Sequence, residues 1–196
     1  MNIDLDIFKA KNNFIKPHRG CVLISDPFSQ DLFFKRSVVF LAEYNNNGSV
    51  GFILNKSTEV LVKDVLDNFD DVNLTVSIGG PVNTNTVHFI HTLGNEIPNS
   101  VNVIDNIFWG GDFDIIKSLL EKGIVNNENI RFFIGYSGWK SQQLEKEIAD
   151  NLWVVSNLNA NDIINMRDSE IWKYSLEKFG DTYKSWINIP ENPYLN

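Results

Sequence analysis

The sequence predicts a single compact α+β domain, and three observations carry this prediction. The chain has 196 residues, of which 43% are hydrophobic and 21% charged, as is typical of a globular domain that buries about 70% of its unfolded surface. Short runs rich in β-branched and aromatic residues indicate strands. Strands occur both as hairpins and separated by amphipathic helices, which favours a mixed α+β arrangement over a doubly wound sheet.

The expected strands begin after an N-terminal arm, 1–19, in which residues 3–10 form an arm or a short helix. The turn 45–48 (Asn-Asn-Asn-Gly) tolerates positive φ and predicts a hairpin between the second and third strands. In chain order, the expected strands span 21–25, 37–43, 50–55, 74–79, 87–91, 101–104, 131–134 and 152–156.

Four helices are expected between and after these strands. The first has the apolar residues 60, 61, 65 and 66 and is capped by Ser57 or Thr58; the second begins at Asp112 and ends at Gly123. A third starts near residue 141. A last amphipathic helix spans 170–179, so that the domain is expected to cover 20–180 and a tail 181–196.

The charge and the cysteine content exclude several classes of protein. A net charge of −8 repels phosphate backbones, which disfavours direct binding of nucleic acid. The single cysteine, Cys21, excludes an intramolecular disulfide and a zinc cluster made of thiolates. The N-terminus does not resemble a signal peptide, and no run of 18 apolar residues is present, so a cytoplasmic protein without membrane contact is expected.

The segment 135–139 (Gly-Tyr-Ser-Gly-Trp) is expected to lie where an apolar strand gives way to a polar helix. A hydrolase elbow needs Gly-x-Ser-x-Gly, but here the second glycine comes one residue early and Trp139 takes its place. We therefore expect Ser137 to cap the following helix. A catalytic Ser137 remains an alternative, although no specific base is identified for it.

Two further candidate binding segments each have a functional and a purely structural interpretation. Arg36 can clamp a carboxylate or phosphate, or form an ion pair with Asp26 or Asp31. The turn 79–81 (Gly-Gly-Pro) is expected to be a tight turn, with anion binding by its N–H groups as the alternative.

The histidines and the carboxylates of the third helix give no clear catalytic or metal site. His88 and His91 point to opposite faces of a strand, so no metal site is expected. Glu145 and Glu147 are expected on a solvated helix face, with one of them reaching back to a strand end.

Taken together, several segments of the sequence resemble the AlgH/YqgE family, whose members are often labelled transcriptional regulators. The matching segments follow the family's order at 20–28, 34–39, 48–55, 79–82, 135–139 and 143–147. The resemblance implies a compact fold with a barrel-like or bifurcated sheet flanked by helices. It implies no established enzyme activity, no known cofactor and no DNA-binding motif.

The favoured function is that of a non-enzymatic protein that binds another protein or a small ligand and affects transcription indirectly. Trp139 is expected as an apolar anchor, Arg36 for charge recognition, and Gln143 with Glu147 as a polar rim. The alternatives are a hydrolase using Ser137 and a direct DNA-binding regulator. The whole expected surface consists of Asp26, Arg36, Asn55, Gly80, Pro81, Tyr136, Ser137, Trp139, Gln143 and Glu147.

Overall fold

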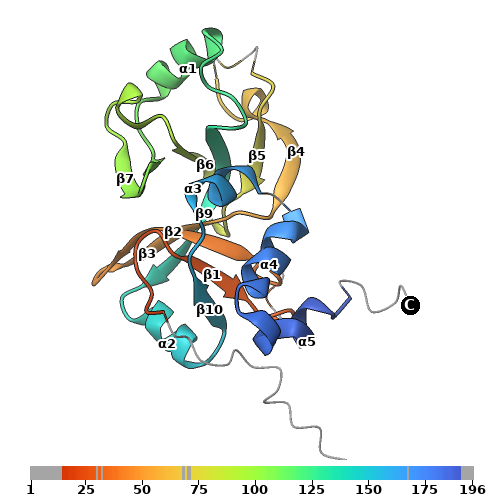
Figure 1. Cartoon of the computed structure of the whole chain (residues 1–196). Coiled ribbons are helices and arrows are strands. Elements are labelled where there is room, and N and C mark those ends of the chain that lie inside the picture. Colours follow the sequence, from red (N-terminus) through yellow and green to blue (C-terminus); the bar gives the residue numbers. More distant parts are fainter. Residues whose placement is uncertain are drawn as a thin grey trace, which may run out of the picture.

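One β-sheet divides around its longest strand, β9, and gives the molecule an upper and a lower half (Figure 1). The structure, a computed structural model, describes residues 15–190 apart from Gln30, Leu32, Asn68, Asp70, Asp71 and Arg167. The strands in the described residues are β1 Val22–Ser25, β2 Val38–Asn45, β3 Gly48–Ile53, β4 Ser57–Leu61, β5 Thr75–Ile78, β6 Val82–His91, β7 Val101–Ile104, β8 Ile107–Trp109, β9 Ile130–Lys140 and β10 Trp153–Ser156. The helices are α1 Phe113–Glu121, α2 Gln143–Ala149, α3 Ala160–Asn165, α4 Asp168–Glu177 and α5 Lys184–Ile187, with 3-10 turns η2 Val62–Asp64, η3 Gly94–Glu96 and η4 Gly180–Tyr183.

The sheet has the order β10-β1-β2-β3-β9-β6-β8-β7, and the β4–β5 pair joins it at β9. Neighbouring strands are antiparallel except for β5 and β9, which are parallel. Residues 132–134 of β9 pair with β5, whereas residues 137–140 pair with β3. This exchange of neighbours makes a bifurcated, mixed sheet, as the family resemblance implied. The barrel-like part is open, since the strand order ends at β10 and β7.

Several elements confirm local predictions. The hairpin at 45–48 joins β2 to β3 in the pairing Asn45↔Gly48. Asp112 is the N-cap of α1, and its side chain accepts hydrogen bonds from the backbone N–H groups of residues 114 and 115. The last predicted helix corresponds to α4, which begins two residues earlier than expected.

The prediction of a helix after Ser57 and Thr58 is wrong. Residues 57–61 form strand β4, and only the short turn η2 follows. Thr58 donates to the Val76 carbonyl at 2.6 Å instead of capping a helix, because pairing with β5 satisfies this backbone. Strand β8 and helix α3 were not predicted.

Strand β9 is also longer than the sequence predicted, and this moves the strand–helix junction. It continues from residue 134 to Lys140, and α2 begins at Gln143. Tyr136 and Gly138 are the more exposed residues here, whereas Ser137 and Trp139 are buried, as strand alternation requires. Ser137 therefore lies within a strand, and its expected role as a helix cap is wrong.

Three apolar clusters stabilise the fold. Alternate residues of β1 and β2 pack into two of them, with Val22 and Phe40 facing the C-terminal helices and Leu23 and Val39 facing α2. Both faces of this half of the sheet are covered, which explains why β1 is a continuous apolar run. The third cluster lies under α1 in the upper half.

The described residues bear only in part on the expected division into arm, domain and tail. The segment 3–10 lies outside them, so the prediction of an arm or helix there stays untested. Beyond residue 180, η4 and α5 bring Tyr183 and Trp186 into the core, where they are 2% and 1% exposed. Every helix in the described part of the chain falls short of the length and apolarity that a membrane span requires.

Candidate functional site

The lower half of the sheet curls until its two end strands, β9 and β10, face each other. Three strands separate them in the sheet order, so a flat sheet would place them about 19 Å apart at the usual strand spacing. The rings of Trp139 on β9 and Trp153 on β10 nevertheless lie edge to face with centroids 5.9 Å apart. The ring of Phe34 packs against both. We call this place, where the curled sheet remains open, the seam.

Glu147 of α2 bridges the seam. Its Oε2 accepts hydrogen bonds from the indole N–H groups of both Trp139 and Trp153, each at 2.8 Å. Its Oε1 accepts from the Gln143 amide at 2.9 Å, one helical turn away. The carboxylate is therefore fixed by three donors. Of the two glutamates, Glu147 is the one that reaches strand residues of the seam.

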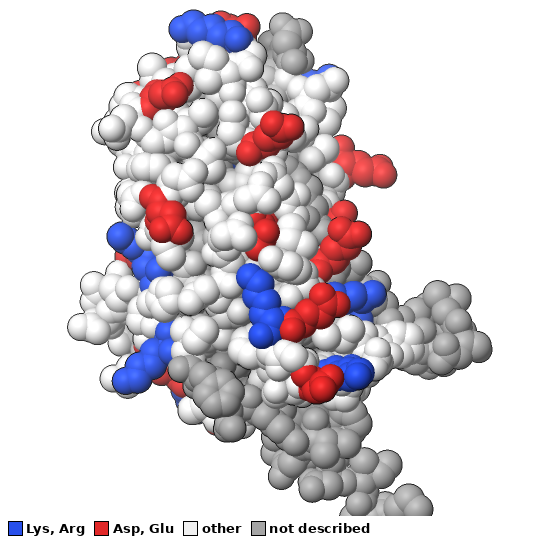
Figure 2. Space-filling view, in the orientation of Figure 1, with Lys and Arg blue, Asp and Glu red and all other residues white. Residues whose placement is uncertain are grey.

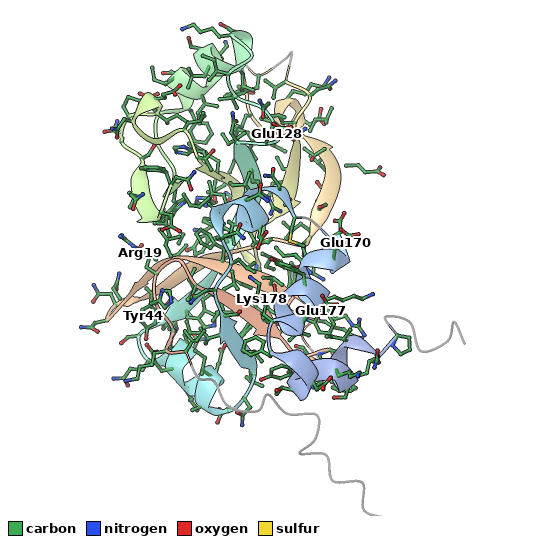
Figure 3. The ribbon with its side chains drawn as sticks, in the orientation of Figure 1. Arg19, Tyr44, Glu128, Glu170, Glu177 and Lys178 are labelled. Carbon is green, nitrogen blue, oxygen red and sulfur yellow. The ribbon has the colours of Figure 1, made fainter. Side chains whose placement is uncertain are left out.

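Helix α2 is held in place on both sides of this bridge. The backbone N–H of Lys140 donates to the Gln143 side chain at 3.0 Å, which fixes the turn between β9 and α2. On the outer face, the Tyr44 hydroxyl donates to Glu145 at 2.8 Å, and Tyr44 lies beside α2 in Figure 3. The position of Glu147 thus follows from contacts along the whole helix.

A pocket of about 510 Å³ opens above the seam. We call it the seam pocket. Its walls are the loop after β1, the segment before β6, the end of β9, helix α2 and the start of β10. Its lining comprises Ser25, Asp26, Phe28, Ser29, Asp31, Phe34, Pro81, Gly138, Trp139, Gln143, Glu147, Leu152 and Trp153.

The loop after β1 is shaped by short-range hydrogen bonds. Asp26 accepts from the backbone N–H of Phe28 at 2.6 Å, and Asp31 accepts from that of Phe33 at 2.9 Å. The Ser25 hydroxyl donates to the Phe34 carbonyl, which closes the base of the loop. Burial raises the pKa of the Asp26 carboxyl, and the hydrogen bonds from the backbone oppose this shift.

Five of the ten residues expected on one surface line the seam pocket. They are Asp26, Pro81, Trp139, Gln143 and Glu147. Tyr136 instead lines a neighbouring hollow of about 470 Å³, which shares the stretch around Trp139 with the seam pocket.

Two other expected site residues brace the loop from behind. Arg36 donates to the Ile189 carbonyl, and its guanidinium lies over the Trp172 ring at 4.9 Å. Asn55 accepts from the backbone N–H of Val38 at 2.9 Å and donates to the Arg36 carbonyl at 2.7 Å. Both side chains hold the segment that ends the pocket loop, and neither lines the pocket.

The last two expected residues lie at the fork of the sheet. Ser137 is fully buried, and its hydroxyl donates to the Gly79 carbonyl at 3.0 Å. A Cβ on Gly80 would lie 2.3 Å from the backbone carbon of Tyr136, so this segment requires glycine for close approach of two backbones. The expected tight turn is not formed at residues 79 and 80; the segment instead passes close to β9 on its way from β5 to β6.

Eight of the thirteen described lining residues were not among the expected site residues, and four of these eight carry large apolar side chains: Phe28, Phe34, Leu152 and Trp153. Phe28 and Leu152 are 49% and 48% exposed, so both apolar side chains are open to solvent. Phe28 and Phe34 lie within segments that were recognised, but a sequence gives no indication of which aromatic residues remain exposed. Trp153 meets Trp139 only through the curl of the sheet.

The described residues carry no cluster of side chains suited to a metal ion. No group of three or more His, Cys, Asp and Glu residues among them could hold a metal. The face in Figure 2 shows acidic and basic side chains interspersed, without a continuous basic field. His88 and His91 lie on opposite sides of β6; His88 packs against Phe52, and His91 against Phe108.

Comparison with known proteins gives consistent matches along nearly the whole chain. A family model described as AlgH-like matches residues 22–184. A UPF0301 protein of Bacteroides thetaiotaomicron is 41% identical over all of both chains, and one of Chlorobium limicola is 37% identical over 94% of this chain and 99% of its own. The solution structure of the AlgH protein from Pseudomonas aeruginosa superposes with a TM-score of 0.69 at 20% identity, covering 85% of this chain and 92% of that one. A crystal structure of a Corynebacterium diphtheriae protein gives a TM-score of 0.70 at 22% identity, covering 88% and 92%.

Proposed function

This chain belongs to the AlgH-like family, and we propose that it is a binding protein that holds a small ligand in the seam pocket without transforming it. The observation that carries this proposal is the Trp139–Glu147–Trp153 bridge at the pocket floor. A volume of about 510 Å³ lies within the range of about 300–1,000 Å³ that is typical of small-molecule sites.

The bridge supports binding because its polar groups are fixed before a ligand arrives. Both oxygens of Glu147 already have donors, which hold them in place before a ligand binds. Preorganised groups of this kind reduce the entropy that binding costs. The exposed ring of Phe28 and the exposed side chain of Leu152 add apolar area at the entrance of the seam pocket.

The hydrolase alternative receives less support from the geometry. Its nucleophile would be Ser137, whose hydroxyl is fully buried and donates to a backbone carbonyl. A serine in this position needs the sheet fork to open before a substrate can reach it. We therefore place the ligand site at the seam rather than at Ser137.

Any effect on transcription is proposed to be indirect, through the ligand-bound protein. The net charge of −8 opposes the phosphate contacts that supply most of the affinity of DNA-binding proteins. A mobility-shift titration at low salt is expected to show no complex. A complex that weakens steeply as salt rises would replace this proposal by direct DNA binding.

The proposal is tested by a thermal-shift screen against a library of metabolites, followed by mass spectrometry of each hit. A ligand present at 100 times its Kd stabilises the folded state by about 2.7 kcal/mol, which is readily measured. The shift should decrease in Leu152→Ala. It should persist in Ile124→Ala, which removes an apolar side chain of similar exposure (40%) away from the pocket.

Two results would contradict the proposal. If both variants keep the full shift for every hit, the ligand lies outside the seam pocket. If a hit is chemically converted during incubation, and the conversion stops in Leu152→Ala, the pocket is catalytic.

A further inference from the structure

We propose that the seam pocket selects a small organic cation, an amine or guanidinium group attached to an apolar body; this inference rests on the proposed function and specifies its ligand. Two independent properties of the lining support it: the sign of its charges, and the aromatic rings beside them. The volume of the pocket and the lack of clustered metal-ligating side chains in its described lining then favour an organic cation over a metal ion or a partner's side chain.

The charged groups of the lining are all acidic. Asp26, Asp31 and Glu147 line the pocket, and among the described residues none that lines it is a lysine or arginine. The two undescribed residues of the same loop, Gln30 and Leu32, are uncharged by sequence. A phosphate or carboxylate ligand would therefore enter beside like charges, whereas a cation would be attracted.

Aromatic rings contribute a second attraction of the same sign. Phe28 stands exposed in the wall, while Phe34, Trp139 and Trp153 form the base. The face of an aromatic ring carries a partial negative charge and binds ammonium and guanidinium groups. The apolar part of the same ligand would bury against Phe28 and Leu152.

The fixed carboxylate of Glu147 makes the pocket selective for a cation over a neutral ligand of the same shape. All three groups that fix it are N–H donors, so both of its oxygens act as acceptors at the pocket floor. A positive group beside it gains Coulomb energy without any rearrangement of the protein. A hydroxyl in the same place would gain only one hydrogen bond.

The alternatives of a metal ion and of a partner's side chain fit less well. The described carboxylates of the pocket are not grouped closely enough to hold a metal ion. A volume of about 510 Å³ suits a drug-sized molecule, which is larger than a single lysine or arginine side chain. We therefore assign the pocket to a free small molecule.

The test uses three probes with the same phenyl body and different charges: 2-phenylethylammonium, 2-phenylethanol and phenylacetate. Binding to the full chain is followed by NMR through the five tryptophan indole N–H signals. Trp139→Phe and Trp153→Phe assign two of these signals. The cation should shift both of them and bind about tenfold more tightly than the alcohol, with phenylacetate weakest.

Matched variants separate local charge from net charge. Asp26→Asn with Asp31→Asn keeps the side-chain oxygens that accept backbone N–H groups, and it should lower the preference for the cation, with Glu147 retaining the rest. Asp114→Asn with Glu128→Gln changes the net charge equally, away from the pocket lining, and should leave the preference unchanged.

Each other outcome overturns the inference at a different point. If 2-phenylethanol binds as tightly as the cation and shifts the same two signals, the inference about charge is wrong while the proposed binding function stands. If no probe shifts these signals, the cation inference falls, and the metabolite screen decides the proposed function separately. If a blocked peptide with one lysine binds more than about tenfold tighter than the free amine, the occupant is a protein side chain.

Discussion

Replacing Glu147 by alanine removes the acceptor that joins β9, β10 and α2. Trp139 and Trp153 are 6% and 4% exposed, so their indole N–H groups lose their partner in a largely buried site. Each buried donor left unsatisfied costs about 1–3 kcal/mol. Because water can enter the seam pocket, we expect the lower half of the summed range, a loss of about 2–4 kcal/mol. For a chain of this length the loss lowers Tm by roughly 5–15 °C.

The measurement is urea unfolding followed by circular dichroism, which does not depend on the two indoles. Glu145→Ala is the matched control, because it makes the same change on the same helix but breaks only the exposed bond to Tyr44. It should cost less than about 1 kcal/mol. Glu147→Gln keeps an oxygen acceptor and should fall between the two, since a charge-assisted bond is roughly twice as strong as a neutral one. If Glu147→Ala and Glu145→Ala agree within about 0.5 kcal/mol, the bridge does not stabilise the seam.

Two further predictions concern the upper half and the sheet core. Arg131 is buried and donates to the Ile163 and Met166 carbonyls at 2.9 and 3.2 Å and to the Leu54 carbonyl. Arg131→Met should therefore lower the free energy of unfolding in urea by about 3 kcal/mol or more. A loss below about 1 kcal/mol would show that these three hydrogen bonds are dispensable. Burial lowers the pKa of His91 below 6.5, opposed by the Gly110 carbonyl, and its Nδ1 accepts from the Leu93 N–H. The unfolded state then binds the proton more readily, so the free energy of unfolding should be constant above about pH 7 and fall as pH drops through 6.5. His91→Gln should flatten this dependence between pH 7 and 5, and an unchanged slope would assign it to other groups.

The candidate site was partly visible in the sequence. Trp139, Gln143 and Glu147 lie in two adjacent segments of the chain. The i,i+4 spacing of Gln143 and Glu147 predicts their contact on a helix. Their association with Asp26 was expected only through the family resemblance. Phe28 and Leu152 could not be found, because exposure of an apolar side chain depends on the packing of the whole molecule.

Arg131 shows the same limit in the fold. Its position in an apolar strand was clear, but a strand residue has no local signal that it will be buried and bonded to three distant carbonyls. Those acceptors lie 32, 35 and 77 residues away. The error at 57–66 has a related cause, since pairing with β5 overrode a local pattern that fitted a helix.

The sequence alone determined the features that depend on neighbouring residues: the hairpin at 45–48, the capped start of α1, the apolar run of β1, and the AlgH-like family. These features depend on backbone preferences and on the period of the hydrophobic pattern, which a chain carries in any short window. The tertiary structure decided the length of β9, the fork at Gly79 and Gly80, and the meeting of Trp139 and Trp153. These depend on which distant strands pair and on how strongly the sheet curls, and both follow from the packing of all three apolar clusters together.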